Sequence, residues 1–574
     1  MADVEAMLRE RLGQAFEAVV GTPADPMIRR SQHADYQADG ALGAARRVQA
    51  NPRELATRIV EQAELDDLCS SVEISGPGFI NLTIRDDAMS RLLADVMAAG
   101  RLGVAPPVVT ETVVVDYSGP NVAKEMHAGH LRSTIIGDAA VRLLEWLGHT
   151  VIRQNHIGDW GTPFGMLIEH LADLGEDEAA HELSIGDLNG FYRSARVKFD
   201  SDDEFAQRAR RRVVLLQNGD ADTLRMWQLL IGESQKYFMT VYDQLGVRLT
   251  TSDFAGESAY NDDLASVATE LESLGLARDS DGALCVFPDG FRGRNGEPLP
   301  LIVRKSDAGY GYASTDLAAI RYRLRKLGAT RLLYVVGSPQ HQHFEMVFQA
   351  AREAGWLAAP ARAEHIGHGS VLGADGKMLR SRAGESVRLI DLLDEAVTRA
   401  SAAVAEKNPG LDERAQDAVA HAVGIGAVKY ADLSTDRNKD YILDYDRMLS
   451  FDGDTGPYLQ YAHARIRSIF RRAGIDPPES APDLVIAEPA ERALALALLE
   501  FPSVIGEVEQ SLQFHRIAAY LFDLATAFTG FYESCPVLKA EGRVRSSRLV
   551  LCALTASILA TGLGLLGIED PHQL

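Results

Sequence analysis

The composition of the chain is typical of a folded protein with several domains. Its 574 residues are 46% hydrophobic and 24% charged, which excludes disordered, collagen-like and fibrous proteins, and roughly 100 to 200 residues per domain gives three or four domains. Acidic residues outnumber basic ones by 81 to 58, and the net charge of −23 disfavours indiscriminate binding to nucleic acid, so any RNA contact must be local.

The cysteines and the N-terminus indicate the cell compartment. The cysteines form no CxxC pair, which argues against a zinc cluster or a disulfide framework and favours a reducing cytoplasm. They are Cys69, Cys285, Cys535 and Cys552. Residues 1–16 mix acids and arginines with apolar residues, as an amphipathic helix does and a signal peptide does not. We therefore expect a cytoplasmic protein.

Residues 1–108 are predicted to form a small N-terminal α+β domain. Helical patterning leads to alternating apolar residues around a Gly-Pro-Gly break at 76–78, which is typical of a short strand pair. A joint that contains two prolines then leads to the second region, 109–385. The change of pattern at this joint predicts a domain boundary.

The second region begins with a βαβ unit. A β-branched run at 112–117 is typical of a strand that is buried on both faces of a parallel sheet. A helix over about 131–147 and a strand at 150–154 follow it. Charged helical segments and an irregular Gly- and Asp-rich stretch over about 165–300 indicate an insertion. Sheet-like runs resume afterwards, which predicts a doubly wound parallel sheet that the insertion splits. These runs lie at 331–337 and 363–366.

The last region, 386–574, is predicted to be an all-α helical bundle, because it contains Ala- and Leu-rich helical patterns and no convincing strand. Within it, residues 549–568 are uncharged over a length that is sufficient to span a bilayer. We interpret this segment as a buried bundle helix and not as a membrane anchor, because glycines and threonines dilute it and charges flank it.

A short histidine motif carries the first chemical signal. His127, Gly129 and His130 follow the first strand of the sheet and begin the next helix, where open α/β sheets bind their ligands. Helix N-terminal amides favour anions, and two imidazoles can donate to phosphate oxygens, so these residues, with Lys124 upstream, suit ATP. A metal-binding pair or two core histidines are the alternatives that the motif leaves open.

A second HxGH sequence, with histidines at 365 and 368, is not expected to bind phosphate. It ends a strand and runs into a hairpin-like stretch, 369–376, with no helix N-terminus after it. The next residues, 376–384, form a loop with three cations, which predicts a clamp on the pyrophosphate of ATP. A solvated basic turn is the alternative for this loop.

Several longer motifs in a fixed order resemble the class I aminoacyl-tRNA synthetases, and in detail the arginyl-tRNA synthetases of the bacterial type. The resemblance covers nearly the whole chain. The motifs are DYSGPNVAKEMHAGHLRSTIIGD, NHIGDWGTPFGMLIEHL, YASTDLAAIRYR, VVGSPQ, GKMLRSRAG, LSFDGDTGPYLQYAHARIRS and RSSRLVLCALTASIL. The family fold thus implied is a tRNA-contacting N-terminal domain, a Rossmann-like catalytic domain with an insertion, and a helical anticodon-binding domain. This agrees with the predicted multidomain α/β organisation.

The resemblance implies an arginine–tRNA ligase that uses ATP and Mg²⁺. Arginine would be activated to arginyl-adenylate and transferred to the 3′ end of tRNA(Arg), and activation would require bound tRNA. Proofreading by the insertion is not expected, because a polar pocket with two acids rejects analogues that lack the guanidinium by roughly 10⁴ to 10⁵.

The arginine pocket is predicted from charge and from the family. A guanidinium is held best by carboxylates, and Asp116 ends the first strand while Tyr312 and Asp316 lie four apart on a possible helical turn. The family uses the matching positions, together with Asn121 and Gln340, to bind the amino acid. A helix cap for Asp316 and a turn residue for Asn121 are the alternatives.

The second signature of the family is altered here. Where Lys-Met-Ser-Lys-Ser is usual, the chain has Leu379 in place of the first serine and Arg380 in place of the second lysine. In this family a lysine before the histidine motif is thought to substitute, which matches Lys124. The predicted catalytic and ATP-binding residues are His127, Gly129, His130, Lys124, Lys377, Arg380 and Ser381.

For tRNA, the helical region contains a candidate patch. Tyr458, Tyr461 and Arg465 share one helix face, where rings can stack on unpaired anticodon bases and a guanidinium can meet phosphate. The family uses these positions near the anticodon. The alternative is a buried tyrosine pair with a surface arginine. Segments 35–37 and 76–81 resemble the family segment that meets the tRNA elbow.

We therefore expect a cytoplasmic, monomeric arginine–tRNA ligase that binds neither DNA nor membrane. Two other classes stay open at this point. One is a non-catalytic tRNA-binding paralogue, and the other is a different HxGH nucleotidyl transferase, against which the helical region of about 190 residues argues.

Overall fold

The computed structural model describes residues 3–175, 188–307, 309–379, 386–481 and 484–571. The chain divides into two compact units. One unit contains Pro107–Leu449 with Leu565–Ile568, and the other contains Met1–Pro106 with Ser450–Gly564 and the last residues. Helices α14 (Leu389–Lys407), α15 (Glu413–Leu433) and α16 (Tyr445–Met448) therefore group with the parallel sheet. The predicted boundary at residue 385 stays a prediction.

In the unit that contains both chain ends, an antiparallel sheet of order β1-β2-β4-β3 packs with helices. The strand pair expected around the Gly-Pro-Gly turn is β3 and β4, paired from Cys69↔Ile84 to Ser75↔Phe79. The elements of this unit are α1 Val4–Val20, β1 Ile28–Arg30, β2 Tyr36–Ala38, α2 Gly40–Val48, α3 Pro52–Gln62, β3 Cys69–Ser75, β4 Phe79–Ile84, α4 Asp86–Ala98, α17 Gly456–Ala473, α18 Pro489–Leu499, α19 Phe501–Ser511, α20 His515–Ser534 and α21 Gly542–Leu565.

Helix α21 contains the apolar segment that raised the question of a membrane. Among the described residues it is the one helix long and apolar enough to cross a bilayer by length and composition, and 78% of its most apolar window is buried inside the protein. A Cβ atom on Gly562 would lie 2.5 Å from a methyl group of Leu521 on α20, so the two helices pack closely. This burial agrees with the prediction of a bundle helix.

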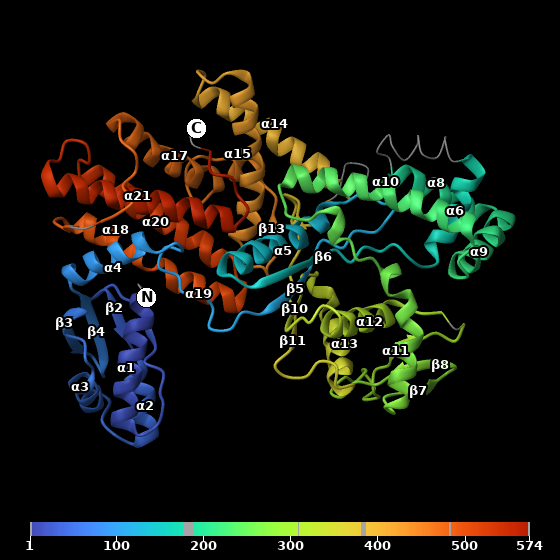
Figure 1. Cartoon of the computed structure of the whole chain (residues 1–574), viewed down its shortest axis with the longest axis horizontal. Helices are drawn as coiled ribbons and strands as arrows, with labels where there is room; N and C mark the ends of the chain where they lie inside the picture. Colours follow the sequence, from blue (N-terminus) through green and yellow to red (C-terminus); the bar gives the residue numbers. More distant parts are fainter. Residues whose placement is uncertain (1–2, 176–187, 308, 380–385, 482–483, 572–574) are drawn as a thin grey trace. The chain divides into compact units, whose positions relative to one another are not determined.

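The other unit is built on a parallel sheet of order β11-β10-β5-β6, which confirms the predicted doubly wound α/β fold (Figure 1). The elements of this unit are β5 Thr112–Asp116, α5 Ala128–Leu147, β6 Thr150–Gln154, α6 Pro163–Leu174, α8 Leu188–Ser201, α9 Asp203–Gln217, α10 Ala221–Leu245, η1 Thr251–Asp253, η2 Glu257–Tyr260, α11 Asn261–Ser273, β7 Ala277–Ser280, β8 Ala283–Val286, β9 Leu301–Arg304, α12 Tyr312–Arg325, β10 Arg331–Tyr334, η3 Ser338–Gln340, α13 His341–Glu353, β11 Arg362–His365, β12 Val371–Leu372, α14 Leu389–Lys407, α15 Glu413–Leu433, β13 Tyr441–Ile442 and α16 Tyr445–Met448.

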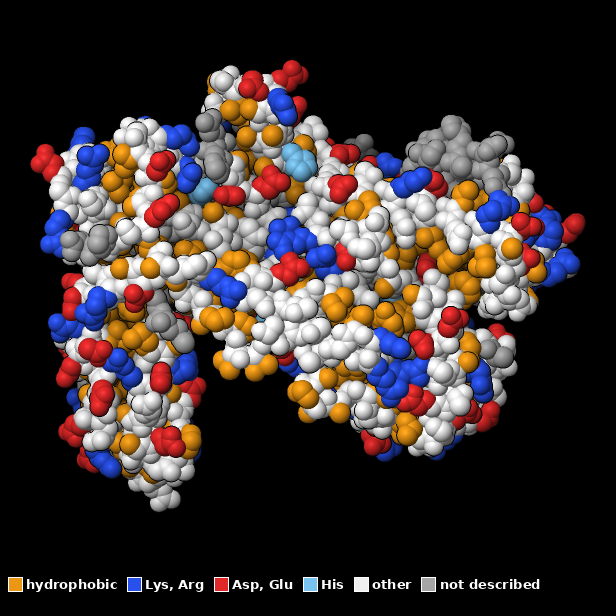
Figure 2. Space-filling view, in the orientation of Figure 1, with side chains coloured by type: hydrophobic (Ala, Val, Ile, Leu, Met, Phe, Trp, Pro, Cys, Tyr) orange, Lys and Arg blue, Asp and Glu red, His pale blue; other side chains and the backbone are white. Residues whose placement is uncertain are grey.

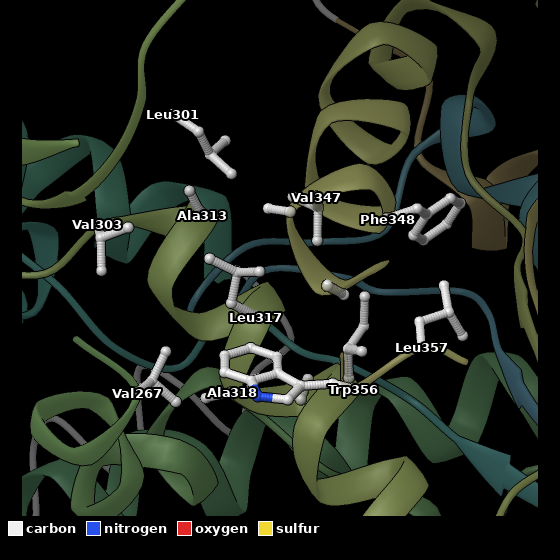
Figure 3. Close-up of a cluster of buried hydrophobic side chains, with 14 of the residues drawn as sticks. Val267, Leu301, Val303, Ala313, Leu317, Ala318, Val347, Phe348, Trp356 and Leu357 are labelled. Carbon is white, nitrogen blue, oxygen red and sulfur yellow. The ribbon is translucent and has the colours of Figure 1, made fainter. Parts of the chain in front are cut away.

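The stretch expected to be irregular within the insertion is a three-stranded antiparallel sheet, β7-β8-β9. Its buried face joins α11, α12 and α13 in one hydrophobic cluster (Figure 3), in which Val303 of β9 and Leu317 of α12 are fully buried. Because α12 is fixed by this cluster, the polar residues at its start are held at the edge of the parallel sheet. The expected absence of strands after residue 386 was also wrong, since β13 pairs in parallel with β12.

Candidate active site

The strand order creates a crevice at the carboxyl end of β5. Strands β6 and β10 flank β5, and the chain order reverses between β5 and β10, so this is a topological switch point where open α/β sheets bind ligands. Asp116, the last residue of β5, lies opposite Tyr334 of β10 and Gln154 of β6. The loop that follows β5 leads to helix α5 and its histidine motif.

His127 and His130 cap the start of α5. The backbone N–H of Gly129 donates to Nδ1 of His127 (3.0 Å), and the N–H of His127 donates to Nδ1 of His130 (3.1 Å), which completes a capping box. The ring centroids are 4.1 Å apart. Since each Nδ1 accepts a hydrogen bond, the proton of each neutral ring is on Nε2.

The charge state of the two histidines follows from their surroundings. Burial, and then the nearby Lys124, lowers the pKa of His127, while burial and the neighbouring His127 lower the pKa of His130 to about 3. Both rings are therefore neutral near pH 7 and present Nε2–H donors. Neutral donors at a helix N-terminus suit phosphate oxygens.

Gly129 is required for the position of the His127 ring. A Cβ atom at residue 129 would lie 2.7 Å from Cε1 and 2.8 Å from Nδ1 of His127. A glycine at the start of a helix also lets a phosphate oxygen approach the backbone. The close contact gives it a further role, because any larger residue would displace the imidazole.

Two carboxyl groups act on a third beside this crevice. Asp316, on the first turn of α12, contacts Nε2 of His343 with its Oδ2 atom at 2.6 Å. Asp159 accepts hydrogen bonds from the backbone N–H and the Oγ of Ser258, at 2.8 and 2.6 Å. Glu257 begins η2, and burial followed by the charges of Asp159 and Asp316 raises its pKa to about 7. Burial also raises the pKa of Asp159.

The cluster of Asp159, Glu257 and Asp316, called the acidic pocket below, was only partly found from the sequence. Asp316 was predicted, whereas Asp159, Glu257 and His343 were missed. Asp159 lies within one recognised motif and His343 lies three residues after another, which is the signal that could have indicated them. Glu257 lies outside those motifs, and its position is set by the fold. A pocket with three carboxyl groups favours a cationic ligand.

Asp116 has a partner from the protein itself. Its Oδ2 atom lies 2.8 Å from a terminal nitrogen of Arg323, a fully buried side chain of α12. Nε of Arg323 donates to Oε1 of Gln154 (2.7 Å), and the guanidinium lies over the ring of Tyr334. Asp116 and Asp316, which were predicted to share one substrate guanidinium, thus have different partners in this structure.

The other residues predicted for arginine lie in loops and element ends at the crevice. Tyr312 begins α12 and is 77% exposed. Asn121 lies beside Gly158, where an added Cβ would come within 2.2 Å of the Asn121 Oδ1 atom. Gln340 ends η3, which follows β10, and it is exposed.

The predicted cations lie on two different segments. The ammonium of Lys124 lies 4.4 Å from the ring centre of Tyr192 on α8, in the insertion. Lys377 is exposed in a hairpin turn, where its backbone carbonyl accepts from the N–H of Gly373 (2.8 Å) and its N–H donates to Asp375 (3.1 Å). Arg380 and Ser381 lie outside the described residues.

The second HxGH sequence is not followed directly by a helix, but the start of α13 lies beside it, because Nδ1 of His341, the first residue of α13, is 3.1 Å from Nδ1 of His365. His365 ends β11, and its Nε2 atom is bonded to the carbonyl of Val336 at 2.9 Å. His368 is buried, and its Nδ1 atom lies 2.9 Å from the carbonyl oxygen of Gly369. The short strand β12 follows at Val371. These contacts occupy one nitrogen of each ring with a backbone carbonyl.

The predicted tRNA residues lie in the other unit, on α17. Tyr461 is 38% exposed, while Tyr458 is half-buried and its ring lies 5.6 Å from that of Phe522 on α20. The guanidinium of Arg465 lies over the ring of Tyr532, 4.8 Å from its centre. The two α20 aromatics were missed from the sequence. Figure 2 shows acidic and basic side chains interspersed over the visible face.

The chain was compared with known families and structures. It matches the family described as tRNA synthetases class I (R), catalytic domain, over residues 93–445, with the arginyl tRNA synthetase N terminal domain at 3–84 and the DALR anticodon binding domain at 459–574. It is 57% identical to the arginine–tRNA ligase of Thermobifida fusca and 50% identical to that of Streptomyces avermitilis, with 100% of each chain covered in both cases.

Two solved structures resemble the chain over nearly its full length. The arginyl-tRNA synthetase of Plasmodium falciparum has a TM-score of 0.85 and 30% identity, with 99% of each chain covered. The Thermus thermophilus arginyl-tRNA synthetase has a TM-score of 0.83 and 26% identity, with 99% of this chain and 100% of that chain covered.

Proposed function

We propose that this chain, which belongs to the class I arginyl-tRNA synthetase family, is an arginine–tRNA ligase that uses ATP. The arginine carboxylate attacks the α-phosphorus of ATP, the bond to the β-phosphate oxygen breaks, and pyrophosphate leaves. A hydroxyl group of the terminal adenosine of tRNA(Arg) then attacks the carbonyl carbon of arginyl-adenylate, loses its proton, and displaces AMP. No protein nucleophile is needed.

The observation that carries this proposal is the pair of neutral histidines at the start of α5, beside a pocket of three carboxyl groups. The Nε2–H groups of His127 and His130 are free of the capping bonds and are available to phosphate oxygens. They stabilise the charge that develops as the α-phosphate is attacked. Lys124 and Lys377 supply positive charge, and Mg²⁺ bound with ATP would neutralise part of the phosphate charge.

The guanidinium of arginine enters the acidic pocket. Asp316 accepts one of its forked hydrogen bonds, and Glu257 supplies a second carboxylate that has no ion-pair partner among the described residues. Tyr312, Asn121 and Gln340 complete the amino-acid site. Asp116 supports the arginine site indirectly, because it balances the charge of the buried Arg323.

The remaining features of the proposal concern tRNA and the cell. Arginine–tRNA ligase activity requires tRNA, and Tyr458, Tyr461 and Arg465 are proposed to meet the anticodon loop. The four cysteines are free and buried, which supports a reducing cytoplasm. We propose an N-terminal domain over 1–108, a catalytic domain over 109–385 and an anticodon-binding domain over 386–574. We also propose that the protein is a monomer, and sedimentation equilibrium tests its mass.

The test is arginine-dependent exchange of pyrophosphate into ATP, measured with and without tRNA(Arg) and with each other amino acid as a control. Exchange only with arginine and only with tRNA supports the proposal. Absence of exchange from folded protein that still binds tRNA would favour a non-catalytic paralogue. Exchange without any tRNA binding would favour a different nucleotidyl transferase.

A further inference from the structure

Helix α10 of the insertion contacts the loop between β5 and α5 at two residues with unusual backbone conformations. Ser118 has φ of +72° and Ala123 has φ of +58°, the left-handed region that non-glycine residues rarely adopt. Between them lies Asn121, which the proposed function assigns to the amino acid. Something outside the loop must hold these two residues in place.

The two contacts come from one face of α10, the long helix of the insertion (Figure 1). Ser234 and Tyr242 are eight residues apart, which is about two helical turns, and both are fully buried. The N–H of Ala123 donates to Oγ of Ser234 (2.9 Å), and that hydroxyl donates to the carbonyl of Leu230 (2.8 Å).

The Tyr242 hydroxyl is part of a buried network whose donor directions can be assigned. The N–H of Gly119 donates to Oδ1 of Asn155 (2.9 Å), so the amide nitrogen of Asn155 is the group that donates to the Tyr242 hydroxyl (2.8 Å). Burial raises the pKa of Tyr242, which keeps the phenol protonated. Its proton therefore goes to Oγ of Ser118, at 2.7 Å.

The other side of Ser118 is held by α5 and the sheet. The N–H of Ser118 donates to Oγ of Ser133 (2.9 Å), and this hydroxyl donates to the carbonyl of Val335 (2.6 Å). The same helix α10 also supports the acidic pocket, since Nε1 of Trp227 donates to the backbone carbonyl of Asp159 (2.8 Å). One helix thus supports both the loop and one acid of the pocket.

We propose that Tyr242 and Ser234 are positioning residues for arginine: from the inserted helix they hold the loop 118–123 in its left-handed conformation and so place Asn121. The inference rests on the proposed function. The start of α5 has its own support, because the two histidines cap it and the N–H of Ala128 donates to the carbonyl of Val387 (3.0 Å). Loss of the Tyr242 hydroxyl is therefore expected to weaken the binding of arginine more than the binding of ATP.

The experiment compares steady-state kinetics of aminoacylation for Tyr242→Phe, Ser118→Ala and Ser118→Gly. Loss of one buried hydrogen bond to the loop is expected to raise KM for arginine about tenfold in Tyr242→Phe and in Ser118→Ala, with KM for ATP unchanged within about twofold. Ser118→Gly keeps KM for arginine within about twofold of the wild type, because glycine adopts a positive φ freely.

Two control variants separate positioning from simple loss of stability. Tyr445→Phe removes another tyrosine hydroxyl of the same unit, one that donates to the carbonyl of Leu392 (3.0 Å) away from the loop. Thr240→Val removes a hydroxyl on the exposed face of α10 that donates only to the carbonyl of Lys236 (3.1 Å). Both are expected to keep wild-type KM values.

Three results would overturn the inference. The first is an unchanged KM for arginine in Tyr242→Phe and Ser118→Ala, and the second is a Ser118→Gly variant as impaired as Ser118→Ala. The third is a loss that affects arginine and ATP equally and follows the fall in Tm. A wild-type protein with no arginine-dependent activity would overturn the proposed function as well, whereas an active wild type with unaffected variants contradicts only this inference.

Discussion

Arginine binding to the acidic pocket is expected to release a proton from Glu257. In the free protein, burial and the charges of Asp159 and Asp316 raise the pKa of this carboxyl to about 7. A guanidinium in the pocket stabilises the ionised form and lowers this pKa again. Binding at pH 7 therefore releases about half a proton per arginine.

The size of the effect follows from the fraction of Glu257 that is ionised. With a pKa of about 7, this fraction is about one tenth at pH 6 and about nine tenths at pH 8. Because arginine binds the ionised carboxylate, the Kd for arginine is expected to be about tenfold higher at pH 6 than at pH 8. Replacement by Glu257→Gln weakens binding at both pH values and removes most of the difference.

Arginine affinity rises with pH, whereas the contribution of Glu257 to the free energy of unfolding falls. The folded-state pKa of Glu257 lies above its ordinary value of 4.5, so the stability that this group contributes is present below pH 4.5 and is lost as the pH rises through 7. At pH 8 the ionised carboxylate costs at most about 3 kcal/mol, from 1.36 kcal/mol per pH unit. At pH 8, Glu257→Gln is therefore expected to unfold at a higher urea concentration than the wild type. Near pH 4.5 the two proteins are expected to unfold at the same urea concentration.

Isothermal titration calorimetry of arginine binding, in two buffers with different ionisation enthalpies, measures the Kd and the released protons together. The control is Glu272→Gln, which removes the same charge from an exposed position on α11. The reasoning is refuted if the Kd is the same at pH 6 and pH 8, or if Glu257→Gln keeps the wild-type dependence on pH.

Three further predictions concern other residues of the site. Asp316→Ala is expected to raise KM for arginine at least tenfold more than KM for ATP, and equal losses in the two would contradict its place in the pocket. His130→Ala is expected to abolish pyrophosphate exchange while His368→Ala is mild, and the reverse order would move the phosphate site. Arg323→Met leaves the carboxylate of Asp116 buried without its partner, so urea unfolding is expected to show a loss of about 3 to 5 kcal/mol, and a change below 1 kcal/mol would contradict this.

The parallel sheet could be predicted because its signals are local. The β-branched run of β5 and the helical spacing of α5 each lie within about 20 residues, and the structure has these elements close to the expected bounds. Strand β7 gave no such signal, since ARDS contains only polar or small residues. Strands β8 (ALCV) and β9 (LIVR) are more apolar, but each is only four residues long. Their strand conformation depends on pairing with one another and on the hydrophobic cluster around α12.

The histidine motif shows how far a local signal extends into the site. Its position at a helix start follows from the sequence, and so does its suitability for phosphate. The roles of the ring atoms do not, because they depend on which Nδ1 atom accepts from which backbone N–H. The tautomers follow only from these bonds, and they decide that His127 and His130 present Nε2–H donors.

The arginine pocket shows why the partner of a charged residue cannot be predicted from its own segment. Asp116 and Asp316 look alike in the sequence, as acids at element ends, but Asp116 balances the buried Arg323, which is 207 positions away, and Asp316 contacts His343. Glu257 comes from a 3-10 helix in the insertion and has no ion-pair partner among the described residues. It is therefore the acid whose charge state a bound cation must decide, and this assignment depends on contacts that only the fold creates.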